Sequence, residues 1–197
     1  MQKIYTGVGS RDTPDRALQL MHCLGAFLAQ RGWTLRSGGA DGADTAFEQG
    51  AKEHNGLREI FLPWVGFNGS SPHESGPGLT LVSGAAEWTE PVLEAVLDNS
   101  HFANLKRKQG ALKLHCRNVH QILGERPESF ISKLVICWTA GGELKGGTAT
   151  AIKLARKHHV PVLNLGHDDD LERIWSTGPE DLEAVLMGWG NHDRDLK

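Results

Sequence analysis

Apolar and polar positions follow two different periods along the first 63 residues. Three short apolar runs have the length and composition of strands, and they occupy residues 4–8, 33–36 and 58–63. Between these runs, apolar residues recur every three or four positions, which predicts helices over residues 13–31 and 42–54. Strands that alternate with helices in this way predict a parallel sheet with right-handed crossovers.

Three residues mark the expected ends of the first helix. Thr13 is predicted to be its N-cap and Pro14 its first helical residue, because the fixed φ of proline suits that position. Gly32 is expected to end the helix, since glycine is common directly after the last helical turn.

The second half of the chain continues the pattern. Residues 134–138 are continuously apolar, which predicts a central strand that is buried on both faces. A helix is expected over residues 149–158, and a last strand over residues 160–165 is expected near the sheet edge because Pro161 cannot donate a ladder hydrogen bond. Residues 167–190 are expected to form C-terminal helices. The predicted fold class is α/β, a Rossmann-like open parallel sheet of about five strands with helices on both faces.

Residues 64–130 interrupt this pattern and are interpreted as an insertion of loop and helices. Residues 64–84 are rich in Gly, Ser and Pro, and the aromatic residues among them favour an ordered lid over a linker. Helices are expected over residues 91–97 and 102–123. The chain is 197 residues long, which fits one large domain, residues 1–197, that carries this insertion.

The charge balance gives no reason to expect binding to duplex nucleic acid. The formal net charge is −3 and the isoelectric point is about 6.4, whereas proteins that bind duplexes carry a basic footprint. One basic cluster, Lys106-Arg107-Lys108 followed by Lys113 and Arg117, is interpreted as a solvated helix face. Nucleic acid is therefore a less favoured partner than a small molecule.

Neither a metal nor a cofactor is expected. The three cysteines form no C-x-x-C pair, so neither a disulfide framework nor a zinc ribbon is indicated. His115 and His120 are five residues apart, which places them about 140° apart around a helix, so they do not share a face. No apolar run approaches the ~18 residues of a membrane span, and the N-terminus lacks the pattern of a signal peptide. A cytoplasmic location is therefore expected.

Three glycine-rich turns carry the functional prediction, and they are Gly7–Arg11, Ser37–Asp44 and Gly141–Thr148. Each follows a predicted strand and precedes a predicted helix, so all three belong at the carboxyl edge of the sheet, where doubly wound folds bind ligands. Glycine lets backbone approach a ligand closely, and a helix N-terminus offers unpaired N–H groups to an anion. The candidate ligand-binding residues are Gly9, Ser10, Arg11, Ser37, Gly38, Gly39, Ala40, Asp41, Asp44, Trp138, Gly146, Gly147 and Thr148.

Side chains in these turns suit a nucleotide. Ser10 offers a hydroxyl, and the guanidinium of Arg11 can bind two phosphate oxygens. Asp41 and Asp44 either stabilise a helix dipole or accept hydrogen bonds from a ribose or a base, and both interpretations stay open. Trp138 ends the predicted central strand beside the third turn, where it can stack on a base.

Two common nucleotide-binding motifs are absent. Gly7-Val8-Gly9 is not followed by the last glycine of a G-x-G-x-x-G fingerprint. Gly147 stands where a P-loop would have its lysine, and Lys145 is displaced by two residues. ATP hydrolysis by a P-loop mechanism is therefore not expected.

The set Gly9-Ser10-Arg11, Ser37–Asp44 and Gly146-Gly147-Thr148 resembles the SLOG superfamily. This superfamily unites the DprA/Smf DNA-processing proteins with the LOG phosphoribohydrolases and with sensors of nucleotide ligands. The resemblance extends over residues 2–165, and it is strongest to small, often phage-encoded, DprA-like Rossmann-fold nucleotide-binding proteins. It implies a nucleotide-derived ligand held across the three turns, and it implies a homo-oligomer.

The chain departs from the LOG pattern at the position that matters for catalysis. LOG hydrolases carry a glutamate just inside the helix after the third turn, whereas Thr148 is followed here by Ala-Thr-Ala. Cleavage of an N-glycosidic bond needs a carboxylate, by analogy with glycosidases. The candidates elsewhere in the chain are Glu48, Glu87 and Glu143, and the sequence places none of them.

Three functions follow from these observations. The first is the binding of a phosphorylated nucleoside or a nucleotide-derived signal, such as an ADP-ribose-like molecule or a cyclic nucleotide, by a sensor or a sequestering protein. The first alternative is a LOG-like hydrolase or transferase that acts on nucleoside monophosphates. The second alternative is DprA-like binding of single-stranded DNA, which requires a contiguous basic groove. The first is preferred because the turns supply many hydrogen-bond donors and no placed catalytic carboxylate.

Overall fold

The computed structural model describes residues 2–70, 79–83 and 87–189, and its centre is a parallel sheet. The sheet has six strands in the order β4-β3-β2-β1-β5-β6, and all adjacent pairs are parallel. The strands are β1 (Ile4–Gly9), β2 (Thr34–Ser37), β3 (Arg58–Leu62), β4 (Leu79–Ser83), β5 (Leu134–Trp138) and β6 (Val162–Asn164). The α/β class and the parallel sheet with helices on both faces are thereby confirmed.

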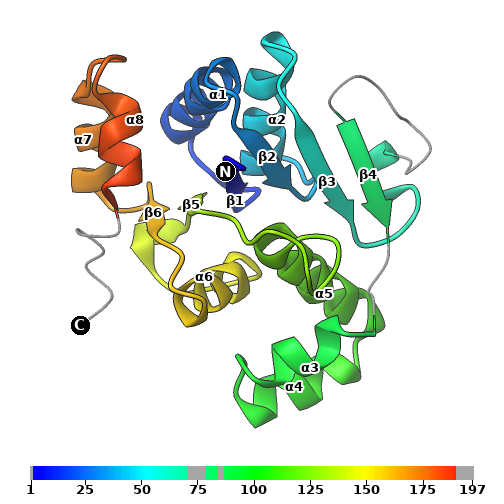
Figure 1. Ribbon diagram of the computed structural model, residues 1–197. Helices are drawn as coiled ribbons and strands as arrows, with labels where there is room; N and C mark the ends of the chain where they lie inside the picture. Colours follow the sequence, from blue (N-terminus) through cyan, green and yellow to red (C-terminus); the bar gives the residue numbers. More distant parts are fainter. Residues whose placement is uncertain (1, 71–78, 84–86, 190–197) are drawn as a thin grey trace.

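Eight α-helices of the described chain surround this sheet (Figure 1). They are α1 (Asp15–Gln30), α2 (Ala43–Glu53), α3 (Thr89–Glu94), α4 (Asn99–Lys106), α5 (Gln109–Leu123), α6 (Thr148–Lys157), α7 (Asp168–Ser176) and α8 (Leu182–Met187). Helices α1 and α2 cover one face, and α5 and α6 cover the other, with α3 and α4 packed against α5. Two 3₁₀ turns, η1 (Phe67–Gly69) and η2 (Ala140–Gly142), follow strands β3 and β5.

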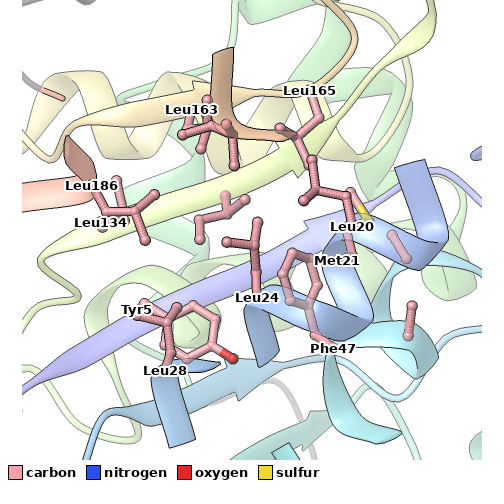
Figure 2. Packing of buried hydrophobic residues seen from close by; sticks show 14 of the residues in the cluster. Tyr5, Leu20, Met21, Leu24, Leu28, Phe47, Leu134, Leu163, Leu165 and Leu186 are labelled. Atoms are coloured by element: carbon pink, nitrogen blue, oxygen red, sulfur yellow. The ribbon is translucent and has the colours of Figure 1, made fainter. Parts of the chain in front are cut away.

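Strand β5, which lies between β1 and the edge strand β6, contributes to two layers of the apolar core. Leu134 and Ile136 belong to the cluster formed with α1, α2, α7 and α8, whose packing is shown in Figure 2. Val135 and Cys137 belong to the cluster formed with α3 to α6. Successive side chains of a strand point to opposite faces, so a strand covered on both sides needs mostly apolar side chains at successive positions. This requirement explains the unbroken apolar run that predicted β5.

Strand β4 lies in the segment that the sequence pattern predicted to be a loop. Its five residues pair with β3 from Arg58 to Leu62 and extend the sheet by one strand beyond the expected five. The prediction of an ordered lid over residues 64–84 falls partly on residues 71–78 and 84, which lie outside the described residues. Within the described part, Phe67 is buried against Ile60 and Leu62 of β3.

Several helix boundaries differ from the prediction, and the helix expected over residues 91–97 is α3, Thr89–Glu94. The single helix expected over residues 102–123 is divided into α4 and α5, because residues 106–110 are all exposed and no side chain there packs on the core. Helix α1 begins at Asp15 after Pro14, which has extended φ and ψ angles and is itself the N-cap. Thr13 was therefore wrongly predicted as the cap, since its hydroxyl donates instead to the Ser10 carbonyl at 2.7 Å.

The cysteines and the helices agree with the expectations from composition. Cys23 is exposed, Cys116 and Cys137 are buried, and none of the three forms a disulfide among the described residues. Among the described residues, no helix has both the length and the apolar character that crossing a membrane requires.

Candidate ligand-binding cavity

The strand order creates a switch point between β1 and β5. From β1 the chain continues through β2, β3 and β4 on one side, whereas β5 and β6 lie on the other side. Connections that leave adjacent parallel strands in opposite directions open a crevice at the carboxyl edge of the sheet, where α/β proteins bind ligands. A cavity of about 530 Å³ lies at this edge, which is within the usual size range of small-molecule sites.

The turn between β1 and α1 forms one wall of the cavity. Gly9, Ser10 and Arg11 all line it. A side chain at Gly9 would stand 2.6 Å from the Cβ of Ala43, so only glycine lets β1 approach the start of α2 this closely. Arg11 is exposed, which leaves its guanidinium free to reach an anion in the cavity.

The segment between β5 and α6 forms the opposite wall. Gly146, Gly147 and Thr148 line the cavity, together with the exposed Lys145. Helix α6 begins at Thr148 after Gly147, and no side chain caps its N-terminus. An uncapped helix N-terminus beside a lysine presents N–H groups and positive charge to the same space, which is the chemistry of an anion site. The first and third predicted turns therefore meet across one cavity.

The middle turn contributes less to the cavity lining. Of its predicted ligand-binding residues, Ala40 and Asp44 line the cavity. Asp44 is buried, and its Oδ2 accepts a hydrogen bond from the Ala40 N–H at 3.3 Å and lies 3.6 Å from Nη1 of Arg117. Burial raises the pKa of Asp44, while the Arg117 guanidinium and backbone N–H groups oppose this shift. The carboxyl group is thus held between the turn and α5.

Three other residues of the middle turn bond within the protein. The Ser37 hydroxyl donates to the Gly7 carbonyl at 2.9 Å, inside the sheet. The Gly38 carbonyl accepts a hydrogen bond from Nη1 of Arg117 at 2.8 Å. The Gly39 N–H donates to a carboxylate oxygen of Glu48 at 3.2 Å. These groups shape the turn and do not line the cavity.

Asp41 and Trp138 also stand outside the cavity lining. Asp41 is exposed and accepts a hydrogen bond from Nδ2 of Asn68 at 2.9 Å. Trp138 is half-buried and packs against the cluster formed with α1 and α2, on the face of the sheet opposite α5.

None of the three glutamates proposed for catalysis lines the cavity. Glu48 lies behind the middle turn, where burial and the nearby charge of Asp44 raise its pKa to about 8. Glu87 is exposed and lines a separate hollow with residues of α3 and α4. Glu143 is exposed and forms an ion pair with Lys145.

Helix α5 supplies cavity residues that the sequence analysis missed. They are Ala111, Leu114, His115, Arg117, Asn118 and Gln121. The spacing of Leu114, Asn118 and Gln121 places them on one face of the helix. Polar residues that continue an apolar stripe were therefore the sequence feature that could have indicated a cavity wall. Arg117 was assigned to a solvated basic face, and that assignment is wrong because its guanidinium is largely buried against Asp44.

Two side-chain contacts join α5 to α6 across the cavity. Nδ2 of the buried Asn118 donates to the Gly147 carbonyl at 2.8 Å. Nδ1 of His115 lies 2.8 Å from the Thr150 hydroxyl. Burial, and then the positive charges of His101 and Arg117, lower the pKa of His115 to about 4. The imidazole is therefore neutral near pH 7, and the positive charge around the cavity comes from Arg and Lys.

The described residues offer no group of three or more His, Cys, Asp or Glu side chains that would suit a metal ion. The His167–Asp170 segment instead forms the start of α7, whose first turn contains all three aspartates. Carboxylates at a helix N-terminus favour the helix dipole, which accounts for this acidic cluster.

The fold has counterparts among solved structures. One is the molybdenum cofactor binding protein from the phototrophic bacterium Rippkaea orientalis, with a TM-score of 0.56 and 19% identity over 94% of this chain and 96% of that chain. Another is DNA processing protein A (DprA) from Streptococcus pneumoniae, with a TM-score of 0.55 and 16% identity over 94% of this chain and 62% of that chain. The fold is similar to the folds of these two proteins. The resemblance inferred from the glycine-rich turns is confirmed at this level.

A third similar structure is DprA from Helicobacter pylori, described for its single-stranded DNA binding mode. Its TM-score is 0.52 and its identity is 17%, over 94% of this chain and 78% of that chain. No family model matches the chain, and no curated protein matches it. At identities of 16 to 19%, these structural likenesses concern the fold and not the ligand.

Proposed function

We propose that this protein binds a phosphorylated nucleoside or a nucleotide-derived signal in the cavity between β1 and β5, as a sensor or a sequestering protein. The observation that carries the proposal is the meeting of two glycine-rich turns across one cavity of about 530 Å³. One turn brings Arg11, and the other brings Lys145 and the uncapped N-terminus of α6. This combination of cations and backbone N–H groups suits a phosphate.

In the proposed arrangement, the phosphate lies between the first and third turns. Gly146, Gly147 and Thr148 offer backbone and hydroxyl donors, and Arg11 offers its guanidinium. The remainder of the ligand lies along α5, which lines the cavity over about 15 Å from Ala111 onward at 1.5 Å per residue. The residues that support the middle turn from behind, Ser37, Gly38 and Gly39, hold its shape and make no contact with the ligand.

A binding role also agrees with the binding roles of proteins that share the fold. One binds the molybdenum cofactor, and another binds single-stranded DNA. A small ligand is preferred here over DNA because the net charge is −3 and the cavity is a concave site lined by both apolar and polar side chains.

Isothermal titration calorimetry with a panel of nucleoside monophosphates, cyclic nucleotides and ADP-ribose tests the proposal. We expect at least one member to bind, and we expect Arg11→Ala to weaken that binding tenfold or more because a charge-assisted contact to phosphate is lost. Arg16→Ala is the matched control, since Arg16 is exposed on α1 and pairs with Glu172 away from the cavity. Failure of every phosphorylated nucleoside to bind would refute the proposal.

The same samples distinguish the alternative functions. Release of free base from a nucleoside monophosphate would indicate cleavage of the N-glycosidic bond, and chromatography of the titrated samples detects it. A gel shift of single-stranded DNA that disappears steeply with salt would indicate DNA binding, because phosphate contacts release counterions.

A further inference from the structure

Among the described residues that line the cavity, only Gln121 has a side-chain amide whose nitrogen and oxygen both lack a hydrogen-bond partner. It lines the cavity from the C-terminal half of α5, and its relative exposure is 1%. Neither its Nε2 nor its Oε1 has a hydrogen-bond partner among the described residues. Buried polar groups in proteins are nearly always paired, so an unpaired amide at a cavity wall indicates a missing partner.

The main chain of Gln121 is firmly anchored, in contrast to its side chain. The Gln121 carbonyl accepts hydrogen bonds from the Thr6 hydroxyl at 2.6 Å and from the Ser132 hydroxyl at 3.2 Å. Thr6 belongs to β1, and its hydroxyl also lies 2.8 Å from that of Ser132. These contacts fix the end of α5 over the sheet, so the amide is held in place with both of its polar ends uncommitted.

A second unsatisfied group lies beside this amide. Nε of Arg117 is buried without a hydrogen-bond partner among the described residues, although the same guanidinium donates to Gly38 and Asn118. Both Arg117 and Gln121 crowd the position that a Cβ on Gly38 would occupy, so they are close neighbours. The part of the cavity wall beside Gly38 therefore contains two buried donor atoms and one buried acceptor that the fold does not use.

The chemistry at Gln121 differs from that at the glycine-rich turns. A primary amide places a donor next to an acceptor, and it pairs with a flat group that offers an acceptor next to a donor. Nucleobase edges have this property, and Gln binds them through two hydrogen bonds. A phosphate offers only acceptors at neutral pH, so it would leave Oε1 of Gln121 unpaired.

We infer that Gln121 reads the heterocyclic base of the ligand and is a specificity-determining residue of this site. The inference rests on the proposed function, which places the phosphate at the glycine-rich turns. Asn118 lies one helical turn from Gln121 and touches Gly147, so α5 connects the phosphate end of the cavity to the base end. The ligand lies along this helix with its base directed toward Gln121.

The test compares base-bearing and base-free probes by calorimetry. The probes are AMP, GMP and UMP, whose bases each carry a donor beside an acceptor, and ribose 5-phosphate, which has no base. We expect at least one nucleotide to bind the unaltered protein tenfold or more tightly than ribose 5-phosphate. Gln121→Met, which keeps the length of the side chain and removes the amide, should reduce this ratio to threefold or less without weakening ribose 5-phosphate.

Gln109→Met is the matched control, because Gln109 is exposed in the first turn of the same helix and does not line the cavity. It should leave the ratio unchanged. Equal binding of ribose 5-phosphate and all three nucleotides would overturn the inference and leave the phosphate site standing. Equal loss of both kinds of probe in Gln121→Met would also overturn it, since that result indicates a structural role. Absence of binding by all four probes and by the cyclic nucleotides and ADP-ribose of the first panel would contradict the proposed function itself.

A second measurement needs no variant and covers the case in which Gln121→Met does not fold. Purine riboside 5′-monophosphate lacks the exocyclic group of the purine nucleotides but keeps the ring, the sugar and the phosphate. If AMP or GMP is the preferred probe, this analogue should bind the unaltered protein at least tenfold more weakly. If UMP is preferred, N3-methyl-UMP serves the same purpose. Binding within threefold of the parent nucleotide would contradict a base-reading amide.

Discussion

At the scale of single residues, two carboxyl groups of α2 stand one helical turn apart and share the middle turn. Asp44 accepts from the Ala40 N–H and lies beside Arg117, while Glu48 accepts from the Gly39 N–H. Residues four apart on a helix face the same side, so the two charges repel. This repulsion adds to burial in raising the pKa of Glu48 to about 8.

The raised pKa of Glu48 predicts a particular pH dependence of stability. An ordinary glutamate in the unfolded chain loses its proton near pH 4.5, whereas the folded protein keeps it to about pH 8. Between these values the folded state binds more protons, so the free energy of unfolding falls as the pH rises. Glu48→Gln should remove this loss of the free energy of unfolding. We put the loss at roughly 1–2 kcal/mol, because the side chain is partly exposed and solvent screens its charge.

Urea denaturation of Glu48→Gln and of the unaltered protein at pH 5 and pH 9 measures this effect. The difference in the free energy of unfolding, variant minus unaltered protein, should be more positive at pH 9 than at pH 5. Glu128→Gln is a suitable control because Glu128 is exposed in the loop between α5 and β5. Parallel pH profiles for Glu48→Gln and the unaltered protein would show that Glu48 is not the titrating group.

At the scale of elements, α1 and α2 pack at unusually close range through two glycines. A side chain at Gly25 would stand 2.6 Å from the Phe47 carbonyl, and one at Gly50 would collide with the His22 carbonyl. The atoms in the way belong to backbone, which cannot rotate aside as a flexible side chain can. This close contact holds α2, and with it the middle turn, in place beneath the cavity.

Gly50→Ala is therefore expected to lower the free energy of unfolding by about 3 kcal/mol, because a well-packed interface must separate to admit the methyl group. Thermal and urea denaturation measure the change. Gly110→Ala is the control, since a Cβ at this exposed position in the first turn of α5 meets nothing. It should raise stability slightly, by up to about 1 kcal/mol, because alanine has the higher helix propensity. Comparable stabilities for the two variants would contradict the close packing of α1 on α2.

At the scale of the whole molecule, the strand order decides where a ligand can lie. The switch point between β1 and β5 is formed by strands 125 or more residues apart in the chain, so a ligand there bridges both halves of the sheet. Such a ligand binds only the folded state, and it should stabilise the entire fold by mass action.

A ligand at 100 times its dissociation constant should raise the free energy of unfolding by about 2.7 kcal/mol. For a chain of this size, that corresponds to an increase in Tm of roughly 5–10 °C, measurable by differential scanning calorimetry. Arg11→Ala at the same ligand concentration should show about half of the increase or less, as expected for tenfold weaker binding. An equal increase for both proteins would place the ligand away from the first turn.

The sequence by itself determined the alternation of strands and helices in this protein. Apolar runs with period two or no period, separated by segments with period 3.6, are local signals, and they predicted β1, β2, β3, β5 and β6 with their crossover helices. Glycine-rich turns after strands also have a local signature, and the parallel direction of the strands brings them to one edge. The chain alone therefore identified Gly9, Ser10, Arg11 and Gly146–Thr148, all of which line the cavity.

Only the tertiary structure decided how the cavity is completed. Whether Ser37 points into the sheet and whether Arg117 points toward solvent or toward Asp44 depend on contacts between residues far apart in the chain. The same holds for α5, because an amphipathic pattern says which face of a helix is buried but not what that face covers. The packing of α5 against the sheet turned a helix with an ordinary pattern into a cavity wall, and it left the amide of Gln121 there without a partner.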